Sequence, residues 1–348
     1  MSRAVPSRSV AWWLTACVVL TGAMILVGGI TRLTRSGLSI TTWDPILGAL
    51  PPLDEGDWRE AFARYASSPE GRVRAPEMDL VAFRHIYLVE WGHRLLGRIV
   101  ALVLLGPMAV FAIRHQLPRA VALRVGGVLL LGFAQAFLGW TMVRSGLIDV
   151  PHVSPYRLAA HFVVGVLLFV VLLWSALDAH SRAPTPRVQA APALRITAGA
   201  ATSLAFLLLV WGALMAGHHA GLVFSDFPTM GGRLLPDGAF GRPVAVGSVV
   251  ADAVTVHFVH RALAFVLLAV MGTLVGIAFR KGSTSRVRWL VVLGAGAVVG
   301  QLTLGAATVI AHVPITLASL HQAGALVVVA SLTALQRELR GEAPYAAL

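Results

Sequence analysis

Two stretches of the 348-residue chain are versions of one another: VEWGHRLLGRIVALVL at residues 89–104 and VHFVHRALAFVLLAVM at residues 256–271. Their alignment places the pair His93-Arg94 on the pair His260-Arg261. Three further segments repeat in the same chain order: SGLSITTWDPILGALPP from Ser36 with AGLVFSDFPTMGGRLLPD from Ala220, QAFLGWTMV from Gln135 with QLTLGAATV from Gln301, and RLAAHFVVG from Arg157 with TLASLHQAG from Thr316, the last with a one-residue slip at the histidine. The chain therefore contains an internal repeat.

The composition indicates a membrane protein. Hydrophobic residues make up 57% of the chain and charged residues only 13%, whereas a soluble chain carries about 25% charged residues. Eight apolar runs reach the roughly 20 residues that cross a bilayer: 10–30, 87–112, 120–142, 158–177, 195–216, 255–279, 288–311 and 317–336. Only helices and closed barrels satisfy their backbone in lipid, and runs of this length exclude barrel strands, so we expect eight helices.

The basic residues predict the orientation. With the N-terminus in the cytoplasm, the inner segments hold fourteen of the 28 lysines and arginines, and the short outer loops hold four. Short cytoplasmic loops of membrane proteins carry this excess of positive charge. We therefore expect a multi-pass protein of the bacterial inner membrane, with both termini in the cytoplasm. The net charge of +12 reflects the same asymmetry, so nucleic acid is not an expected partner.

The fold class predicted is an all-α polytopic membrane protein, with eight transmembrane helices arranged as two parallel-repeat four-helix bundles. An axis along the membrane normal relates such repeats. The expected divisions are an N-terminal bundle at residues 1–180, a cytoplasmic linker rich in proline and alanine at 181–194, and a C-terminal bundle at 195–348.

Four histidines have equivalent positions in this arrangement. His93, His161, His260 and His321 lie near the outer ends of the second, fourth, sixth and eighth helices. Two of them belong to each bundle, and two imidazoles that meet inside a four-helix bundle are suitable axial ligands for a haem iron. Hydrogen-bonded interior histidines are the simpler alternative. Zinc is disfavoured because it usually takes four ligands, often cysteines, and Cys17 is the only cysteine. Gly92, Gly97, Gly165 and Gly324 lie nearby and leave room for a flat macrocycle.

Glu90 breaks the symmetry of the repeat, because His257 takes its place in the second half. Residues three apart share a helix face, so we expect Glu90 to face the same pocket as His93. A buried carboxylate beside a macrocycle can transfer protons or stabilise a developing positive charge. The alternative is an ion pair with Arg94 or Arg98 that lowers the cost of burial.

These motifs resemble the haem A synthase family. The resemblance is carried by GGITRLTRSGLSITTWDPILGALPP after the first helix, EWGHRLLGR, GWTMVRSGL, PYRLAAH, AGLVFSDFPTMGG, the His-Arg pair at 260–261, and LHQAGAL. It covers nearly the whole chain and is closest to the proteobacterial and mitochondrial branch. Some bacterial members carry a pair of cysteines in an outer loop, which this chain lacks, so no step here depends on those thiols.

The resemblance implies an enzyme that oxidises the C8 methyl group of haem O to a formyl group, by successive hydroxylations, and so supplies haem A to terminal oxidases. It implies Glu90 as the catalytic carboxylate and His93, His161, His260 and His321 as haem-iron ligands. We assign His93 and His161 to the haem O pocket because Glu90 lies there, and His260 and His321 to a resident haem b. The Arg residues of the two His-Arg pairs are candidates to bind haem propionates.

The implied partners are haem O, the haem O synthase that supplies it, a ferredoxin-like electron donor and membrane lipids; a homo-oligomer is compatible with the sequence. Two other functions fit parts of the pattern. A di-haem b electron carrier that reacts with quinone would use the same histidines without needing Glu90. A transporter would also contain parallel repeats, but with its polar site near the middle of the membrane.

Overall fold

The computed structural model describes residues 6–42, 44, 47–148, 151–181, 191–240, 246–280 and 283–340, and these contain helices and no strand. Eight of the helices are long and apolar enough to cross a membrane, which confirms the predicted spans. They are α1 (Arg8–Leu33), α4 (Leu80–Ile113), α5 (Arg119–Ile148), α6 (Pro155–His180), α7 (Pro192–Gly217), α9 (Ala253–Arg280), α10 (Ser285–Ile310) and α11 (Ile315–Arg340). Most of the expected linker, residues 182–190, lies outside the described residues.

Local sequence determines where these helices begin. The side chains of Ser7, Asp79 and Thr284 accept hydrogen bonds from the first turns of α1, α4 and α10. Such caps satisfy amide groups that have no partner within the helix. Proline begins α6 and α7, where its missing N–H costs no hydrogen bond. Each apolar run is thereby extended by a few residues beyond the bounds expected from hydropathy alone.

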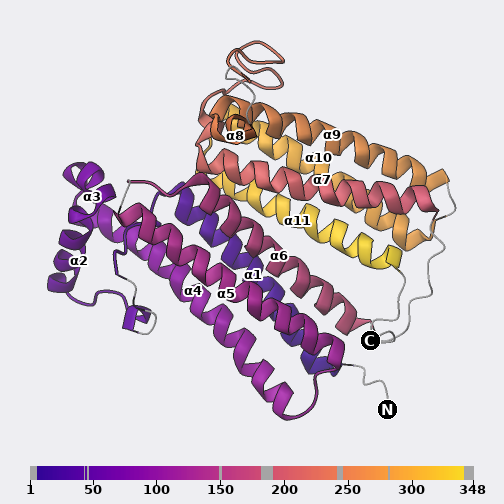
Figure 1. Cartoon of the computed structure of the whole chain (residues 1–348), viewed down its shortest axis with the longest axis horizontal. Helices are drawn as coiled ribbons and strands as arrows, with labels where there is room; N and C mark the ends of the chain where they lie inside the picture. Colours follow the sequence, from indigo (N-terminus) through magenta and orange to yellow (C-terminus); the bar gives the residue numbers. More distant parts are fainter. Residues whose placement is uncertain are drawn as a thin grey trace.

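The long helices form two groups that lie side by side (Figure 1). In the first group α1 packs against α4 and α6, and α5 packs against α6. In the second group α7 packs against α9 and α11, and α10 packs against α9 and α11. The groups meet where α1 and α6 contact α7 and α11. These contacts are consistent with two four-helix bundles of the same design.

Each group has its apolar core at one end. The core of the second group joins the first half of α7 and α10 to the second half of α9 and α11, from Leu194 to Leu339. The core of the first group joins the start of α1 and α5 to the end of α6, with α4 side chains packed against it. All four candidate histidines lie toward the other end of their helices, where a smaller apolar cluster around Ala159, Leu214 and Val256 packs near them.

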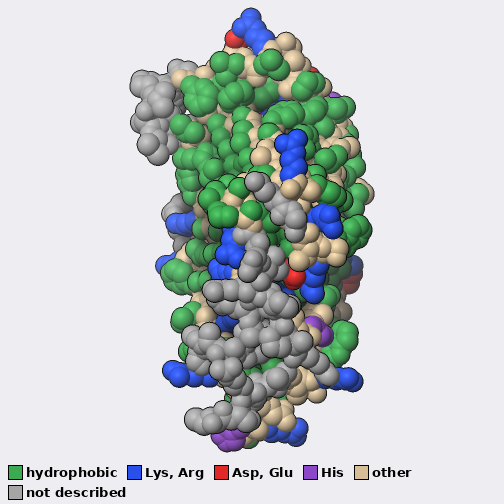
Figure 2. All heavy atoms as spheres, turned by 90° about the vertical axis from the view of Figure 1, so that its right-hand side faces the viewer, with side chains coloured by type: hydrophobic (Ala, Val, Ile, Leu, Met, Phe, Trp, Pro, Cys, Tyr) green, Lys and Arg blue, Asp and Glu red, His purple; other side chains and the backbone are tan. Residues whose placement is uncertain are grey.

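The end that holds the cores carries basic side chains and few acidic ones. Figure 2 looks onto this end, where blue Lys and Arg side chains are scattered over the face and red acidic ones are few. Inside the same end, Asp178 of α6 accepts from Arg124 of α5 and from Arg337 of α11, the latter at 2.6 Å. Asp178 therefore ties the two groups of helices together.

The segment between α1 and α4 contains two helices that the hydropathy pattern does not predict: α2 (Glu55–Ser67) and α3 (Pro69–Arg74). Trp58, Tyr65 and Phe83 form a small aromatic core that packs α2 against the start of α4. In the described part of the corresponding region of the second half, the structure has the 3₁₀ turn Ala220–Leu222 and the short helix α8 (Val246–Ala251). We call α2 and α3 the helical cap of the N-terminal half.

Candidate haem-binding site

The four histidines form two pairs, as expected. His93 of α4 and His161 of α6 lie within electrostatic range of each other, and so do His260 of α9 and His321 of α11. The two members of each pair come from helices that do not follow each other directly in the bundle. In each half, two imidazoles from different helices therefore lie near each other.

A glycine on a neighbouring helix lies directly against each imidazole ring, and we call this contact a glycine seat. A Cβ atom built on the glycine would lie 2.9–3.3 Å from the Cε1 atom of the ring, closer than ordinary van der Waals contact. The pairs are Gly28 with His93, Gly139 with His161, Gly212 with His260 and Gly305 with His321. In each case the glycine lies on the transmembrane helix just before that of its histidine. These glycines differ from the four that the sequence suggested, and no atom lies within 4 Å of a Cβ built on Gly92.

The two ring nitrogens of these histidines have different surroundings. Nδ1 of each ring is buried and makes no well-formed hydrogen bond within the described part of the chain. The rings of His161, His260 and His321 do approach the backbone carbonyl groups of Gln135, Leu208 and Gln301. The side-chain amides of the two glutamines lie 3.1 and 3.4 Å from Nε2 of His161 and His321.

Two such pairs fit a haem and do not fit a zinc ion. Buried imidazoles without strong partners are the groups that a metal completes, and a carbonyl contact, which three of the four rings have, is the usual way to fix the tautomer of a metal-binding histidine. These imidazoles would hold the iron of a haem in each half. Among the described residues no three His, Cys, Asp or Glu side chains converge as a metal cluster needs. The histidine donors therefore form two separate pairs, one in each half.

Glu90 lies three residues before His93 on α4, and both of its carboxylate oxygens are engaged. It is 2% exposed. Oε1 accepts from Nη2 and Nε of Arg94, at 2.6 and 3.1 Å, and Oε2 accepts from the hydroxyl of Ser39 and the backbone N–H of Ile40, both at 2.8 Å. The ion-pair alternative raised from the sequence is therefore realised with Arg94. The carboxylate is held one helical turn from His93 by the segment that follows α1.

The second half repeats this arrangement with a histidine in place of the carboxylate. Nε of Arg261 donates to Nε2 of the fully buried His257 at 2.9 Å. Nη1 of Arg261 donates to the carbonyl oxygens of Asp226 and Thr229. In the first half, Arg94 likewise donates to the carbonyl oxygens of Ile40 and Thr42.

The arginine of each His-Arg pair thus binds the segment that follows the first long helix of its own half, after α1 for Arg94 and after α7 for Arg261. These backbone partners differ from the propionate contacts that the sequence suggested. No sequence motif marks a carbonyl oxygen as an arginine acceptor, so the pattern could not have been read in advance.

Residues 11–333 match the COX15-CtaA family, described as cytochrome oxidase assembly proteins. The chain belongs to this family. It is 43% identical to the haem A synthase of Rhodospirillum centenum over 92% of this chain and 85% of that protein. It is 42% identical to the haem A synthase of Caulobacter vibrioides over 96% and 97% of the two chains, and 36% identical to that of Wolbachia pipientis over 91% and 88%. These names do not support an electron carrier or a transporter.

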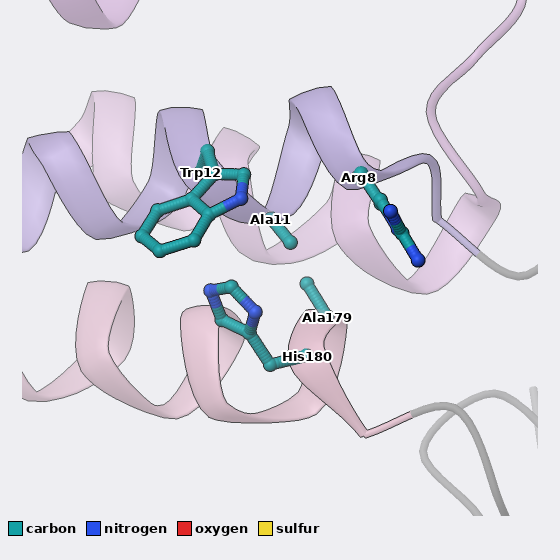
Figure 3. A pocket seen from close by; sticks show the side chains of 5 residues that line it. All are labelled: Arg8, Ala11, Trp12, Ala179 and His180. Carbon is teal, nitrogen blue, oxygen red and sulfur yellow. The ribbon is translucent and has the colours of Figure 1, made fainter.

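A cavity of this family member lies far from the four candidate haem-binding histidines. It has a volume of about 450 Å³ and is lined by Arg8, Ala11, Trp12, Ala179 and His180. Figure 3 shows these side chains between the start of α1 and the end of α6. Trp12 and Gly28 are 16 residues apart on α1, roughly 24 Å along the helix. The cavity is therefore separate from the candidate site.

Proposed function

We propose that this chain acts as a haem A synthase, which oxidises the C8 methyl group of haem O to a formyl group. The observation that carries the proposal is the combination of two glycine-seated histidine pairs with a buried carboxylate beside only one of them. The family and the names of the relatives support the same activity. The product would serve terminal oxidases.

The two halves divide the work in this proposal. His93 and His161 hold the substrate haem O in the N-terminal half, residues 1–180, because Glu90 lies there. His260 and His321 hold a resident haem b in the C-terminal half, residues 195–348. The haem b supplies one-electron redox chemistry when bound.

Glu90 is the catalytic residue in this proposal. Oxidation of a methyl carbon removes hydrogen from it, so protons must move at the site. Glu90 is the carboxylate held next to the substrate pocket, and the donors around it fix its position. Arg94 offsets the negative charge when Glu90 is ionised and so limits the cost of burying it.

The cellular setting follows from the same proposal. The protein lies in the bacterial inner membrane with both termini in the cytoplasm, as the basic end seen in Figure 2 supports. A haem O synthase supplies the substrate, and a ferredoxin-like protein delivers or accepts the electrons. The segment 181–194 links the two halves on the cytoplasmic side.

Substitution Glu90→Gln tests the proposal, with the protein expressed alongside a supply of haem O. A lost acid–base group costs about 10²–10⁴ in rate, so we expect haem A formation to fall at least about 100-fold while haem b content stays normal. Arg94→Gln is the matched comparison, since it breaks the same ion pair but keeps the carboxylate; we expect it to lose less activity than Glu90→Gln, because the group that transfers protons remains although its charge partner is lost. Equal losses in the two variants would reduce Glu90 to a structural partner, and a normal yield of haem A in Glu90→Gln would refute its catalytic role.

A further inference from the structure

The cavity between the start of α1 and the end of α6 combines a cation, two rings and a floor of small side chains (Figure 3). Arg8 and Trp12 reach it from α1 and His180 reaches it from α6, and all three residues are exposed. The rings of Trp12 and His180 meet edge to face, with their centroids 5.2 Å apart. Ala11 and Ala179 are buried and complete the lining. Because these two side chains are small, they leave the space between the helices open.

A hydrogen bond across the two helices fixes the imidazole of His180. Its Nε2 atom lies 3.0 Å from Oγ1 of Thr15, and that oxygen donates its single proton to the backbone carbonyl of Ala11. Thr15 must therefore accept from His180, so Nε2 carries a hydrogen. Nδ1 has no hydrogen-bond partner among the described residues. In the protonated form of the ring, Nδ1 also carries an N–H group, which is a donor for an anion.

In the described part of the chain no acidic side chain pairs with Arg8. The acidic residue that comes just before the lining of α6 is Asp178, and its two carboxylate oxygens are already bound by Arg124 and Arg337. The surrounding face carries basic side chains and few acidic ones (Figure 2). Arg8 is therefore a guanidinium at an open cavity without a carboxylate to neutralise it, and its electrostatic complement is an anion.

An exposed apolar stripe leads from this cavity along α1. Trp12, Ala16 and Val19 follow Arg8 at intervals of four, four and three residues, which places all four on one face of the helix. Trp12 and Val19 are each 64% exposed. The stripe from Arg8 to Val19 is roughly 16 Å long, and the hydrocarbon of one leaflet is about 15 Å thick, half of the bilayer core. The stripe thus has the length of one acyl chain, with a cation at its end.

We propose that the cavity binds the phosphate headgroup of an anionic phospholipid, whose acyl chain lies along the stripe from Trp12 to Val19. Arg8 provides the charge and a pair of N–H groups for two phosphate oxygens, and protonated His180 donates from the opposite helix. Trp12 lies at the boundary between headgroup and chain, where tryptophan is common in membrane proteins. Basic pockets between transmembrane helices bind anionic headgroups in this way.

The stripe distinguishes a lipid from a free phosphate ion, because an ion would use the same cation but would make no contact with Trp12 or Val19. A zwitterionic lipid is a poorer match, since its headgroup brings a second cation close to Arg8. The bound lipid would bridge α1 and α6 within the N-terminal bundle. This inference is independent of the haem chemistry proposed above.

The test is native mass spectrometry of the full-length protein, released from micelles with equal amounts of phosphatidylglycerol and phosphatidylcholine. We expect the first bound lipid of the wild type to be phosphatidylglycerol. Arg8→Gln should reduce that preference about fivefold, which is the effect of one basic residue near a membrane surface. Arg114→Gln is the matched control, because Arg114 is exposed at the end of α4 and lies outside the cavity lining. Trp12→Ala should weaken retention of both lipids alike, since its ring contributes apolar contact and no charge.

Equal retention of the two lipids by the wild type, or an unchanged preference in Arg8→Gln, would overturn the proposal. The Tm in detergent provides a second readout. Phosphatidylglycerol should raise the Tm of the wild type more than an excess of inorganic phosphate does; if phosphate alone gives the full rise, the ligand is a free anion and the lipid is refuted. Without added lipid, Arg8→Gln and Arg114→Gln should both melt with the wild type, and a lower Tm of Arg8→Gln alone would show that Arg8 supports the fold instead.

Discussion

Gly305→Ala is the sharpest test of how the histidines are held. A Cβ atom at position 305 would lie 2.9 Å from Cε1 of His321, whereas carbon atoms rest at about 3.5–4.0 Å. The ring would have to retreat by roughly 0.6 Å or more, several times the ~0.2 Å tolerance of metal–ligand distances. The helix backbone has little room to yield instead, since α10 packs along both α9 and α11.

The expected effect is a weaker hold on the resident haem. Overpacking costs about 1–3 kcal/mol, which corresponds to roughly a 5- to 150-fold loss of affinity at about 1.4 kcal/mol per factor of ten. Alanine gains about 1 kcal/mol of intrinsic helix propensity over glycine, so the steric term must exceed an opposing gain. Gly296→Ala measures that gain by itself, because nothing lies within 4 Å of its added methyl group on the same helix.

The assay is the rate at which haem b passes from purified protein to an excess of haem-free globin. We expect Gly305→Ala to release haem roughly 5- to 150-fold faster. Gly212→Ala, whose contact with His260 is looser at 3.3 Å, should show a smaller change, and Gly296→Ala should behave as wild type. Equal release rates and unchanged haem spectra in all three variants would show that the glycine seats have no role in ligand placement.

Two further changes test the frame around the site. Asp178→Asn would leave the buried guanidinium of Arg337 without its carboxylate, so we expect a loss of about 3–5 kcal/mol and a clearly lower Tm in detergent, while the same change at the exposed Asp237 leaves Tm unaltered. His219, just after α7, is partly exposed, and the desolvation of its inner side together with the charge of Arg32, whose Nη2 lies 3.1 Å from its Nδ1, lowers its pKa to about 4. An unfolded histidine takes up its proton near pH 6.5, so stability is lost as pH falls from that value toward 4; in His219→Gln the Tm should depend less steeply on pH across that window, and an unchanged slope would contradict this account.

The membrane helices were predictable because apolar runs and their flanking charges are written directly in the chain. The sixth run was expected at 255–279 and the helix extends over Ala253–Arg280. The grouping of the histidines was also predictable, since the repeat matches His93 with His260 and places all four histidines near the same ends of their helices, two in each half. Both inferences need only the hydropathy pattern and the order of the repeated segments.

The glycine seats and the arginine contacts were not predictable in the same way. Which glycine meets His93 depends on the rotation and vertical offset of α1 against α4, and a sequence with 34 glycines does not state these quantities. Arg94 binds carbonyl oxygens of an irregular segment, and every residue carries a carbonyl. The α2–α3 cap was missed because its helices are short and polar, with an apolar face of only a few residues.

The comparison of the halves separates what holds a haem from what acts on one. Glycine seats, glutamines beside the histidines and the arginine that fastens the outer segment occur in both halves, so they belong to a common means of placing two imidazoles. Within the described residues, a buried carboxylate one turn before the first histidine, with a serine hydroxyl donating to it, and a cap containing a second buried carboxyl belong to the first half. Carboxyl groups can take up and release protons, and an electron carrier with two equivalent haems would have no use for them on one side alone. The asymmetry therefore argues for proton-coupled chemistry in the N-terminal half, where the substrate haem is proposed to bind.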